Sequence, residues 1–357
     1  MKRFLLRLFV SLCWGAIFLL VLFSSKMQQI FPSLEKEIDI FTWSDIFNPQ
    51  VIENFEKQTN IKVKLHYYTS NEELLVKLKA TKGKGYDLIV PSDYAVKILS
   101  DGHLLKEIDK SKLHFADKIH PLLQGYDFDP SMTFSIPFQW DIMGMGIDKE
   151  FFKERPLSPS WKQIFDEKAI FYKIAMVNDP IEAFNLAALY LFNSVADLDQ
   201  TKITKIKQLL EKQKSWVEAY TDYRSSYLLA TGNCPLAVSM SSYIWRLSLR
   251  FNFVSFIFPQ DKMLVSIENF AIPRASVKEY LTYQFLNFIF QPENYAQNCN
   301  YLYLYPSTTD VLPLLDLNED FKKILSDIFE KRPQFYFFRH LIPEKKIREI
   351  WVDVKAS

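Results

Sequence analysis

The chain has 357 residues, of which 48% are hydrophobic and 24% charged, so it is long and apolar enough to form two globular domains. Its 43 basic and 42 acidic residues leave a formal net charge of +1, which excludes an overall attraction to nucleic acid or to acidic lipid. The sequence contains no dinucleotide-binding glycine fingerprint, no HExxH or CxxC metal motif and no Gly-x-Ser-x-Gly elbow. We therefore expect no cofactor, no metal centre and no enzymatic activity.

The first 30 residues differ from the rest of the chain. Lys2, Arg3 and Arg7 precede an uncharged apolar stretch from Leu8 to Phe23, a pattern typical of an export signal. The stretch is long for a signal and lacks a clear cleavage site, so an uncleaved N-terminal membrane anchor is the alternative. In either case we expect the remaining chain to work in the periplasm, outside the inner membrane.

The cysteines leave the redox chemistry open. Cys13 lies in the N-terminal segment, whereas Cys234 and Cys299 belong to the globular part of the chain. In an oxidising compartment these two residues could form a disulfide, and two separate buried thiols fit the sequence equally well.

After the N-terminal segment, short apolar runs alternate with segments of helical period. The first series predicts strands at 38–42, 62–67 and 87–90 and helices at 49–58, 72–80 and 94–100. Alternation at this spacing indicates βαβ units and a mostly parallel sheet.

A second series follows the segment 135–140. It predicts strands at 142–147, 172–177, 236–240 and 271–272 and helices at 161–165, 181–192, 203–212, 277–290 and 321–329. No linker rich in Pro, Gly or Ser separates the two series, so we expect the two lobes to be joined through strands.

Two of the predicted strands end in polar and aromatic residues. The strand at 38–42 is followed by Trp43, Ser44 and Asp45, and the strand at 87–90 by Ser92 and Tyr94 after a proline. In open α/β sheets ligands bind beyond the carboxyl ends of the strands. These strand ends are therefore the expected floor of a binding cleft.

The same residues carry a family resemblance that extends in order along most of the chain. The matching stretches are 41–45, 59–63, 70–72, 86–94, 108–113, 135–137, Trp140, 160–161, 178–179, Glu182, 271–273 and 305–306. In these stretches the chain resembles the periplasmic spermidine/putrescine-binding proteins of ABC importers.

The resemblance implies a fold and a division of the chain. It implies an α/β periplasmic binding protein of type II, in which each of two lobes is a mostly parallel sheet flanked by helices and the ligand lies between the lobes. Residues 37–144 plus 268–312 would form the first lobe, and residues 145–267 plus 313–357 the second. It also implies a polyamine ligand, an ABC permease as membrane partner and a monomeric chain.

The resemblance further implies a set of ligand-binding residues. A polyamine carries ammonium groups separated by methylene spacers, which suits separated carboxylates with aromatic faces between them. The family's positions correspond to carboxylates at Asp45, Asp179, Glu182 and Glu268, to aromatic rings at Trp43, Tyr94 and Tyr305, and to the hydroxyl of Ser92.

Two positions depart from the family pattern. Met240 and Ser266 each stand where the family usually has a tryptophan. Each missing aromatic wall removes about 0.5 to 2 kcal/mol of cation–π stacking, although a methionine can still pack against methylene groups. The preferred polyamine and its affinity are therefore left open.

Other roles also fit the predicted site residues. Asp45 and Asp179 each stand before a helix and could serve as N-caps, with Glu182 completing a capping box at the second helix. Trp43 and Tyr94 could pack between the lobes without touching a ligand.

Three other functions also remain as alternatives. The first is capture of an anion, of another cation or of a metal complex. The second is a hydrolase that uses two carboxylates, and the third is a membrane-anchored transporter partner that has altered or lost ligand binding.

Overall fold

The computed structural model describes residues 36–44, 46–196, 198–221, 225–259, 263–317, 319–331 and 335–356. The predicted export signal or anchor at residues 1–30, including Cys13, lies outside these ranges. Within them, no helix is both long enough and apolar enough to cross a membrane.

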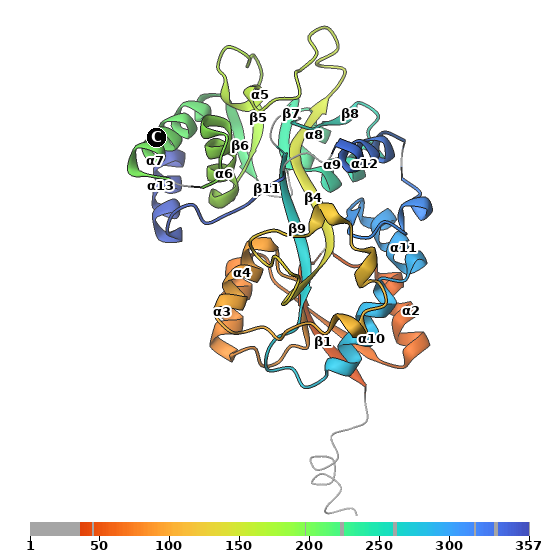
Figure 1. Ribbon diagram of the computed structural model, residues 1–357. Helices are drawn as coiled ribbons and strands as arrows, with labels where there is room; N and C mark the ends of the chain where they lie inside the picture. Colours follow the sequence, from red (N-terminus) through yellow and green to blue (C-terminus); the bar gives the residue numbers. More distant parts are fainter. Residues whose placement is uncertain are drawn as a thin grey trace, which may run out of the picture.

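The chain folds into two lobes that are connected by two long strands (Figure 1). These strands are β4 (Ser135–Asp148) and β9 (Met263–Ala271), which pair antiparallel from Ser135 opposite Ala271 to Met143 opposite Leu264. The predicted lobe boundaries at residues 144/145 and 267/268 fall inside these strands, and this division stays a prediction.

The lower lobe in Figure 1 contains the N-terminal βαβ units. Its strands β1, β2 and β3 are parallel, with Glu37 opposite Lys62 and Ile40 opposite Leu88, and β3 continues antiparallel onto β9. The elements of this lobe are β1 (Glu37–Thr42), α2 (Pro49–Thr59), β2 (Lys62–Tyr67), α3 (Asn71–Thr81), β3 (Leu88–Ile89), α4 (Asp93–Asp101), α10 (Glu279–Ile289) and α11 (Pro292–Leu302).

The upper lobe repeats this plan with different strands. There β5 lies between β6 and β7, parallel to both, and β7 pairs antiparallel with β4. Its elements are α5 (Lys162–Phe165), β5 (Ile174–Val177), α6 (Pro180–Phe192), α7 (Gln200–Gln213), β6 (Val217–Thr221), α8 (Ser225–Ala230), β7 (Leu236–Met240), α9 (Ser241–Ser248), β8 (Val254–Ile257), α12 (Glu319–Lys331) and α13 (Glu344–Ala356).

Two short strands pair with the connecting strands β4 and β9. Strand β10 (Tyr305–Pro306) pairs antiparallel with β4, and β11 (Phe335–Phe337) pairs parallel with β9. Short 3₁₀ helices occur at Lys110–Lys112, Ala116–Lys118, Pro121–Leu123, Lys214–Trp216 and Leu312–Leu314. The sheets are therefore mixed, because the parallel strands of each lobe are completed by antiparallel strands from the connection.

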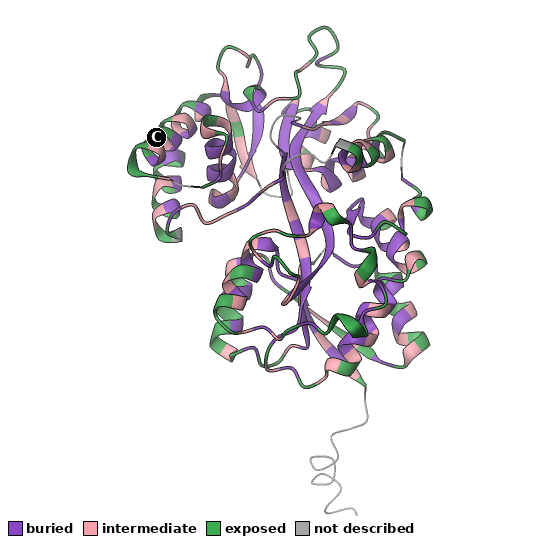
Figure 2. Ribbon diagram, in the orientation of Figure 1, coloured by how far each residue is buried: buried purple, intermediate pink, exposed green. Residues whose placement is uncertain are grey.

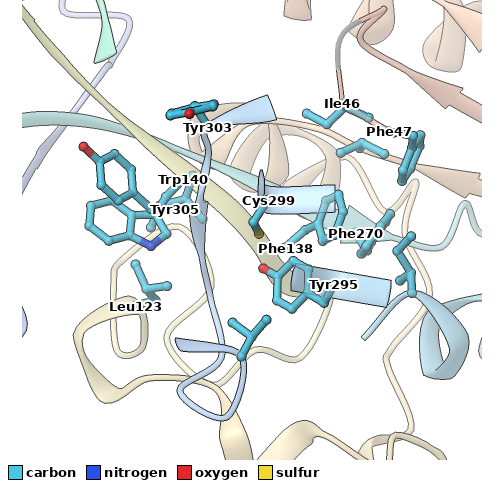
Figure 3. Packing of buried hydrophobic residues seen from close by; sticks show 14 of the residues in the cluster. Ile46, Phe47, Leu123, Phe138, Trp140, Phe270, Tyr295, Cys299, Tyr303 and Tyr305 are labelled. Atoms are coloured by element: carbon cyan, nitrogen blue, oxygen red, sulfur yellow. The ribbon is translucent and has the colours of Figure 1, made fainter. Parts of the chain in front are cut away.

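The connecting strands are buried along almost their whole length, whereas the outer faces of the helices are exposed (Figure 2). Aromatic side chains fill the core beside β4 (Figure 3). The Trp140 ring stacks on the Tyr305 ring at 4.5 Å, and the Phe138 ring lies 4.3 Å from the Phe270 ring. This packing ties β10 to the connection between the lobes.

Both cysteines of the described globular part are free and fully buried. Cys234 precedes β7, and Cys299 lies on α11 among the aromatic side chains of Figure 3. Of the two alternatives that the sequence left open, the structure has two separate thiols.

Candidate functional site

The carboxylate of Glu268 on β9 is the centre of the candidate site. It accepts hydrogen bonds from the Trp43 indole nitrogen at 2.8 Å, from the Ser92 hydroxyl at 2.8 and 3.0 Å, and from the Ser266 hydroxyl at 2.9 Å. Ser92 and Glu268 also form a single antiparallel backbone bridge. Three segments distant in the sequence therefore hold one acidic group in a fixed position.

The local structure explains why these residues meet. Trp43 directly follows β1, Ser92 is the N-cap residue of α4 just after β3, and Ser266 and Glu268 alternate along β9 so that both side chains lie on one face. The Tyr68 ring lies 4.6 Å from the Trp43 ring, and its hydroxyl donates to the Val90 carbonyl. Tyr68 thus packs against the indole that donates to the Glu268 carboxylate.

Burial changes the acidity of this group. The pKa of Glu268 is raised to about 7. Desolvation is the main cause and the nearby charge of Asp141 adds to it, while the hydrogen bonds from Ser92, Ser266 and Trp43 lower the pKa. A carboxyl with this pKa changes its charge near neutral pH. A cation placed beside it would favour the ionised form.

Two further buried acids lie beside β9. Asp93 accepts from the backbone nitrogens of Tyr94 and Ile267, and burial together with the Glu268 charge raises its pKa to about 8. Asp141 on β4 stands opposite Ser266, accepts from the Ser241 hydroxyl at 2.5 Å, and has its pKa raised by burial. Sequence reasoning did not select either residue, although Asp93 stands between two residues that it did select.

Tyr94 on α4 lies between the two lobes. Its ring packs against the hydrophobic cluster of the upper lobe, and its hydroxyl donates to Glu72 Oε1 at 3.1 Å. Burial raises the pKa of Tyr94, and the negative charges of Glu72 and Asp179 add to this effect. Asp179 therefore lies close enough to act on a residue of the lower lobe.

Asp179 and Glu182 lie together at the start of α6. Asp179 is the N-cap residue, whose Oδ1 accepts from the backbone nitrogens of Ile181 at 2.7 Å and Glu182 at 3.0 Å. Both acids are half-buried. The capping role that the sequence suggested for Asp179 is thus confirmed.

The remaining predicted site residues have different settings. Tyr305 is fully buried, with its ring between those of Trp140 and Phe321 and its hydroxyl 3.2 Å from that of Ser241. Met240 is half-buried at the end of β7, opposite Met143 on β4. Asp45 lies outside the described residues. The ligand contacts of all nine predicted residues stay predictions.

One residue that sequence reasoning left aside also reaches this region. His340 follows β11, and its ring lies 5.1 Å from the Tyr94 ring with Nε2 3.4 Å from Glu72 Oε1. The segment around Phe337, Arg339 and His340 aligns poorly with the family, so the sequence assigned no ligand contact there. Among the described residues, no group of three or more His, Cys, Asp or Glu side chains is placed to hold a metal ion.

The chain is similar to known proteins over most of its length. A sequence model of the family described as bacterial extracellular solute-binding proteins matches residues 50–324. A putrescine/cadaverine-binding protein of Pseudomonas aeruginosa is 27% identical over 277 residues, which cover 74% of this chain and 77% of that protein. The putrescine-binding periplasmic protein PotF of Escherichia coli is 28% identical over 302 residues, which cover 79% of this chain and 80% of that protein.

Solved structures give the same result for the fold. The substrate-binding protein PotD of a spermidine/putrescine ABC transporter from Streptococcus pneumoniae superposes with a TM-score of 0.78 at 21% identity, covering 90% of this chain and 99% of that one. The Tp0655 lipoprotein of Treponema pallidum gives a TM-score of 0.74 at 21% identity, covering 89% and 99%. The expected two-lobed α/β fold and the family resemblance are both confirmed.

Proposed function

Because the chain belongs to the bacterial extracellular solute-binding proteins, and within them to the polyamine ABC transporter substrate-binding family, we propose that it captures a polyamine between its lobes. The family is one of binding proteins and not of enzymes, as the sequence predicted. Its members are extracellular or periplasmic, bind a solute and pair with an ABC permease. The proposal adds the ligand, its site and the periplasmic location of this chain.

One observation carries the proposal. The side chains of Trp43, Ser92 and Ser266 hold the Glu268 carboxylate in place. Binding of a cation therefore loses little conformational entropy of this side chain. An ammonium group beside Glu268 would also lie near the Trp43 ring, which suits a cation followed by a methylene chain. A fixed carboxylate of this kind would repel an anion.

The acids at the start of α6 would supply the other half of the site. Asp179 and Glu182 come from the upper lobe, whereas Glu268, Trp43 and Ser92 lie beside the lower-lobe strands. A ligand with separated ammonium groups could then bind both sets at once, which favours a closed arrangement of the lobes. We retain the division at residues 144/145, 267/268 and 312/313 as part of this proposal.

Thermal unfolding in the presence of candidate ligands tests the proposal. Putrescine, cadaverine, spermidine, spermine, lysine and arginine would each be added in turn to the purified chain. A ligand at 100 times its dissociation constant stabilises the folded state by about 2.7 kcal/mol, which gives a clear rise in Tm. We expect this rise with at least one polyamine and a loss of it in the variant D179N/E182Q.

A second function has support from one feature of the site. Met240 and Ser266 replace two aromatic walls of the family, and the Ser266 hydroxyl is engaged with Glu268. This favours a transporter partner with altered or lost ligand binding, anchored by the N-terminal segment. A Tm that stays constant with every polyamine and amino acid would overturn polyamine capture and support this second function.

A further inference from the structure

The segment after β11 is fixed to the upper lobe by its backbone. The Arg339 nitrogen donates to Asn185 Oδ1 at 3.0 Å, and the Arg339 carbonyl accepts from Asn185 Nδ2 at 2.9 Å. Asn185 is fully buried on α6, and Phe338 belongs to the same buried cluster as that helix. The position of the next residue, His340, is therefore set by the element that also carries Asp179 and Glu182.

From this fixed segment, His340 extends to the lower lobe. Its Nε2 lies 3.4 Å from Glu72 Oε1, and its ring packs against the Tyr94 ring at a centroid distance of 5.1 Å. The Tyr94 hydroxyl donates to the same oxygen of Glu72 at 3.1 Å. The neighbouring Arg339 makes a second link to this lobe, with its guanidinium 2.9 Å from Asp127.

A half-buried carboxylate beside an aromatic ring is a suitable site for a ligand ammonium group. Glu72 and Tyr94 form such a pair, and the imidazole of His340 already lies against both. A ligand ammonium could reach this pair only by displacing a side chain whose backbone is held by Asn185. Of the carboxylates that the sequence assigned to the ligand, those among the described residues are Glu268 and the pair at the start of α6.

We propose that His340 is a specificity-determining residue that takes the place of one ligand ammonium at Glu72 and Tyr94, so that the site prefers a diamine to a triamine. This inference rests on the proposed function and names its ligand class. Putrescine and cadaverine carry two ammonium groups and match these two acidic positions, Glu268 and the start of α6. Spermidine carries a third ammonium group, and His340 already occupies Glu72, the carboxylate that this proposal assigns to that group.

Isothermal titration calorimetry of the full-length chain with putrescine, cadaverine and spermidine tests this. The unmodified protein should bind both diamines more tightly than spermidine. In H340A, spermidine affinity should rise about tenfold relative to putrescine, the gain expected for one new charge-assisted hydrogen bond. The variant H340A/E72Q should lose this gain, because the carboxylate that H340A exposes would then be absent.

A matched control is available within the chain. His66 also faces a carboxylate, with its Nε2 2.9 Å from Asp39 Oδ1, but on β2 and β1 away from α6. H66A should leave the ratio of spermidine to putrescine affinity unchanged. Circular dichroism would check that each variant is folded, and H340Q replaces H340A if the latter is not.

The outcomes separate the two proposals. If diamines and spermidine bind but their affinity ratio is the same in H340A or H340Q as in the unmodified chain, the role of His340 is wrong while polyamine capture stands. If no polyamine binds any variant, polyamine capture itself is wrong.

Discussion

At the scale of single residues, the protonation of Glu268 controls the charge of the candidate site. Burial is the main reason that its pKa is raised to about 7, and the hydrogen bonds from Ser92, Ser266 and Trp43 only partly offset this rise. Below this pH the free protein holds a proton on Glu268, and a cationic ligand must displace it. Binding is therefore coupled to the loss of a proton, and affinity rises as the pH rises through about 7.

This coupling gives the first prediction. Polyamine affinity should be about tenfold lower at pH 6 than at pH 8. One pH unit below the pKa, only about one tenth of the Glu268 carboxyl groups are ionised and able to bind the cation. Calorimetric titrations at both pH values would measure it. In E268Q the polyamine affinity should be low and should depend much less on pH. Any pH dependence that is left would be due to Asp93. The same tenfold change in E268Q would contradict the role of Glu268.

At the scale of elements, the start of α6 combines two tasks in one residue. Asp179 caps the helix through one oxygen and is also expected to bind the ligand. The start of α7 has the same cap without the second task, since Asp199 Oδ1 accepts from the Lys202 nitrogen at 2.7 Å and the Asp199 side chain is exposed. The two helices therefore offer a matched comparison of stability and binding.

We predict that D179A and D199A each lower the free energy of unfolding by about 0.5 to 2 kcal/mol, the usual value of an N-cap. Only D179A should also weaken polyamine binding. D179N should retain most of the stability, because an asparagine still caps, and lose the affinity. Chemical denaturation and calorimetry would measure the two effects. Equal affinity in D179A and D199A would restrict Asp179 to its structural role.

Strand β4 also depends on the glycine at position 144. A Cβ atom on Gly144 would lie 2.4 Å from the Phe256 ring and 2.8 Å from the Ile257 carbonyl oxygen, so only glycine lets β8 approach β4 this closely. Because the second contact is with backbone, a rotamer change cannot relieve it.

We therefore predict that G144A lowers the free energy of unfolding by about 1 to 3 kcal/mol, the usual cost of overpacking a core. Urea denaturation would measure it. The control is V277A, because Val277 is 91% exposed and its truncation should change stability by less than about 0.5 kcal/mol. A loss in G144A no larger than that in V277A would contradict the packing argument.

At the scale of the whole molecule, the two lobes are joined by the polypeptide itself, and no disulfide links them within the described residues. Cys234 and Cys299 are free, and the connection consists of the buried strands β4 and β9. Burial raises the pKa of Cys234 to about 11 and also raises that of Cys299, so neither is a ready nucleophile.

The last prediction follows from this state of the thiols. Without reductant, a thiol reagent should leave Cys234 and Cys299 unmodified in the native chain and modify both after denaturation, and mass spectrometry of the labelled peptides would locate them. If the two residues stayed unlabelled after denaturation and reacted only after reduction, a disulfide would be present and this prediction would be wrong.

The sequence by itself determined the elements with strong local signals. The apolar period placed α2, β2 and α6 within about two residues of their observed bounds, since these segments carry their own caps and alternation. It did not reveal the length of β4 and β9. A strand buried on both faces loses its alternation, and β9 is interrupted by Ser266 and Glu268, which serve the site.

Only the tertiary structure decided which side chains meet. The residues Trp43, Ser92 and Glu268 were expected near one ligand because of the family resemblance, but their mutual hydrogen bonds depend on the pairing of segments up to 225 residues apart. The burial of Tyr305 and the contact of His340 with Glu72 have the same origin. Local sequence encodes helices, strands and caps, whereas the acidity and neighbours of a buried group depend on long-range packing.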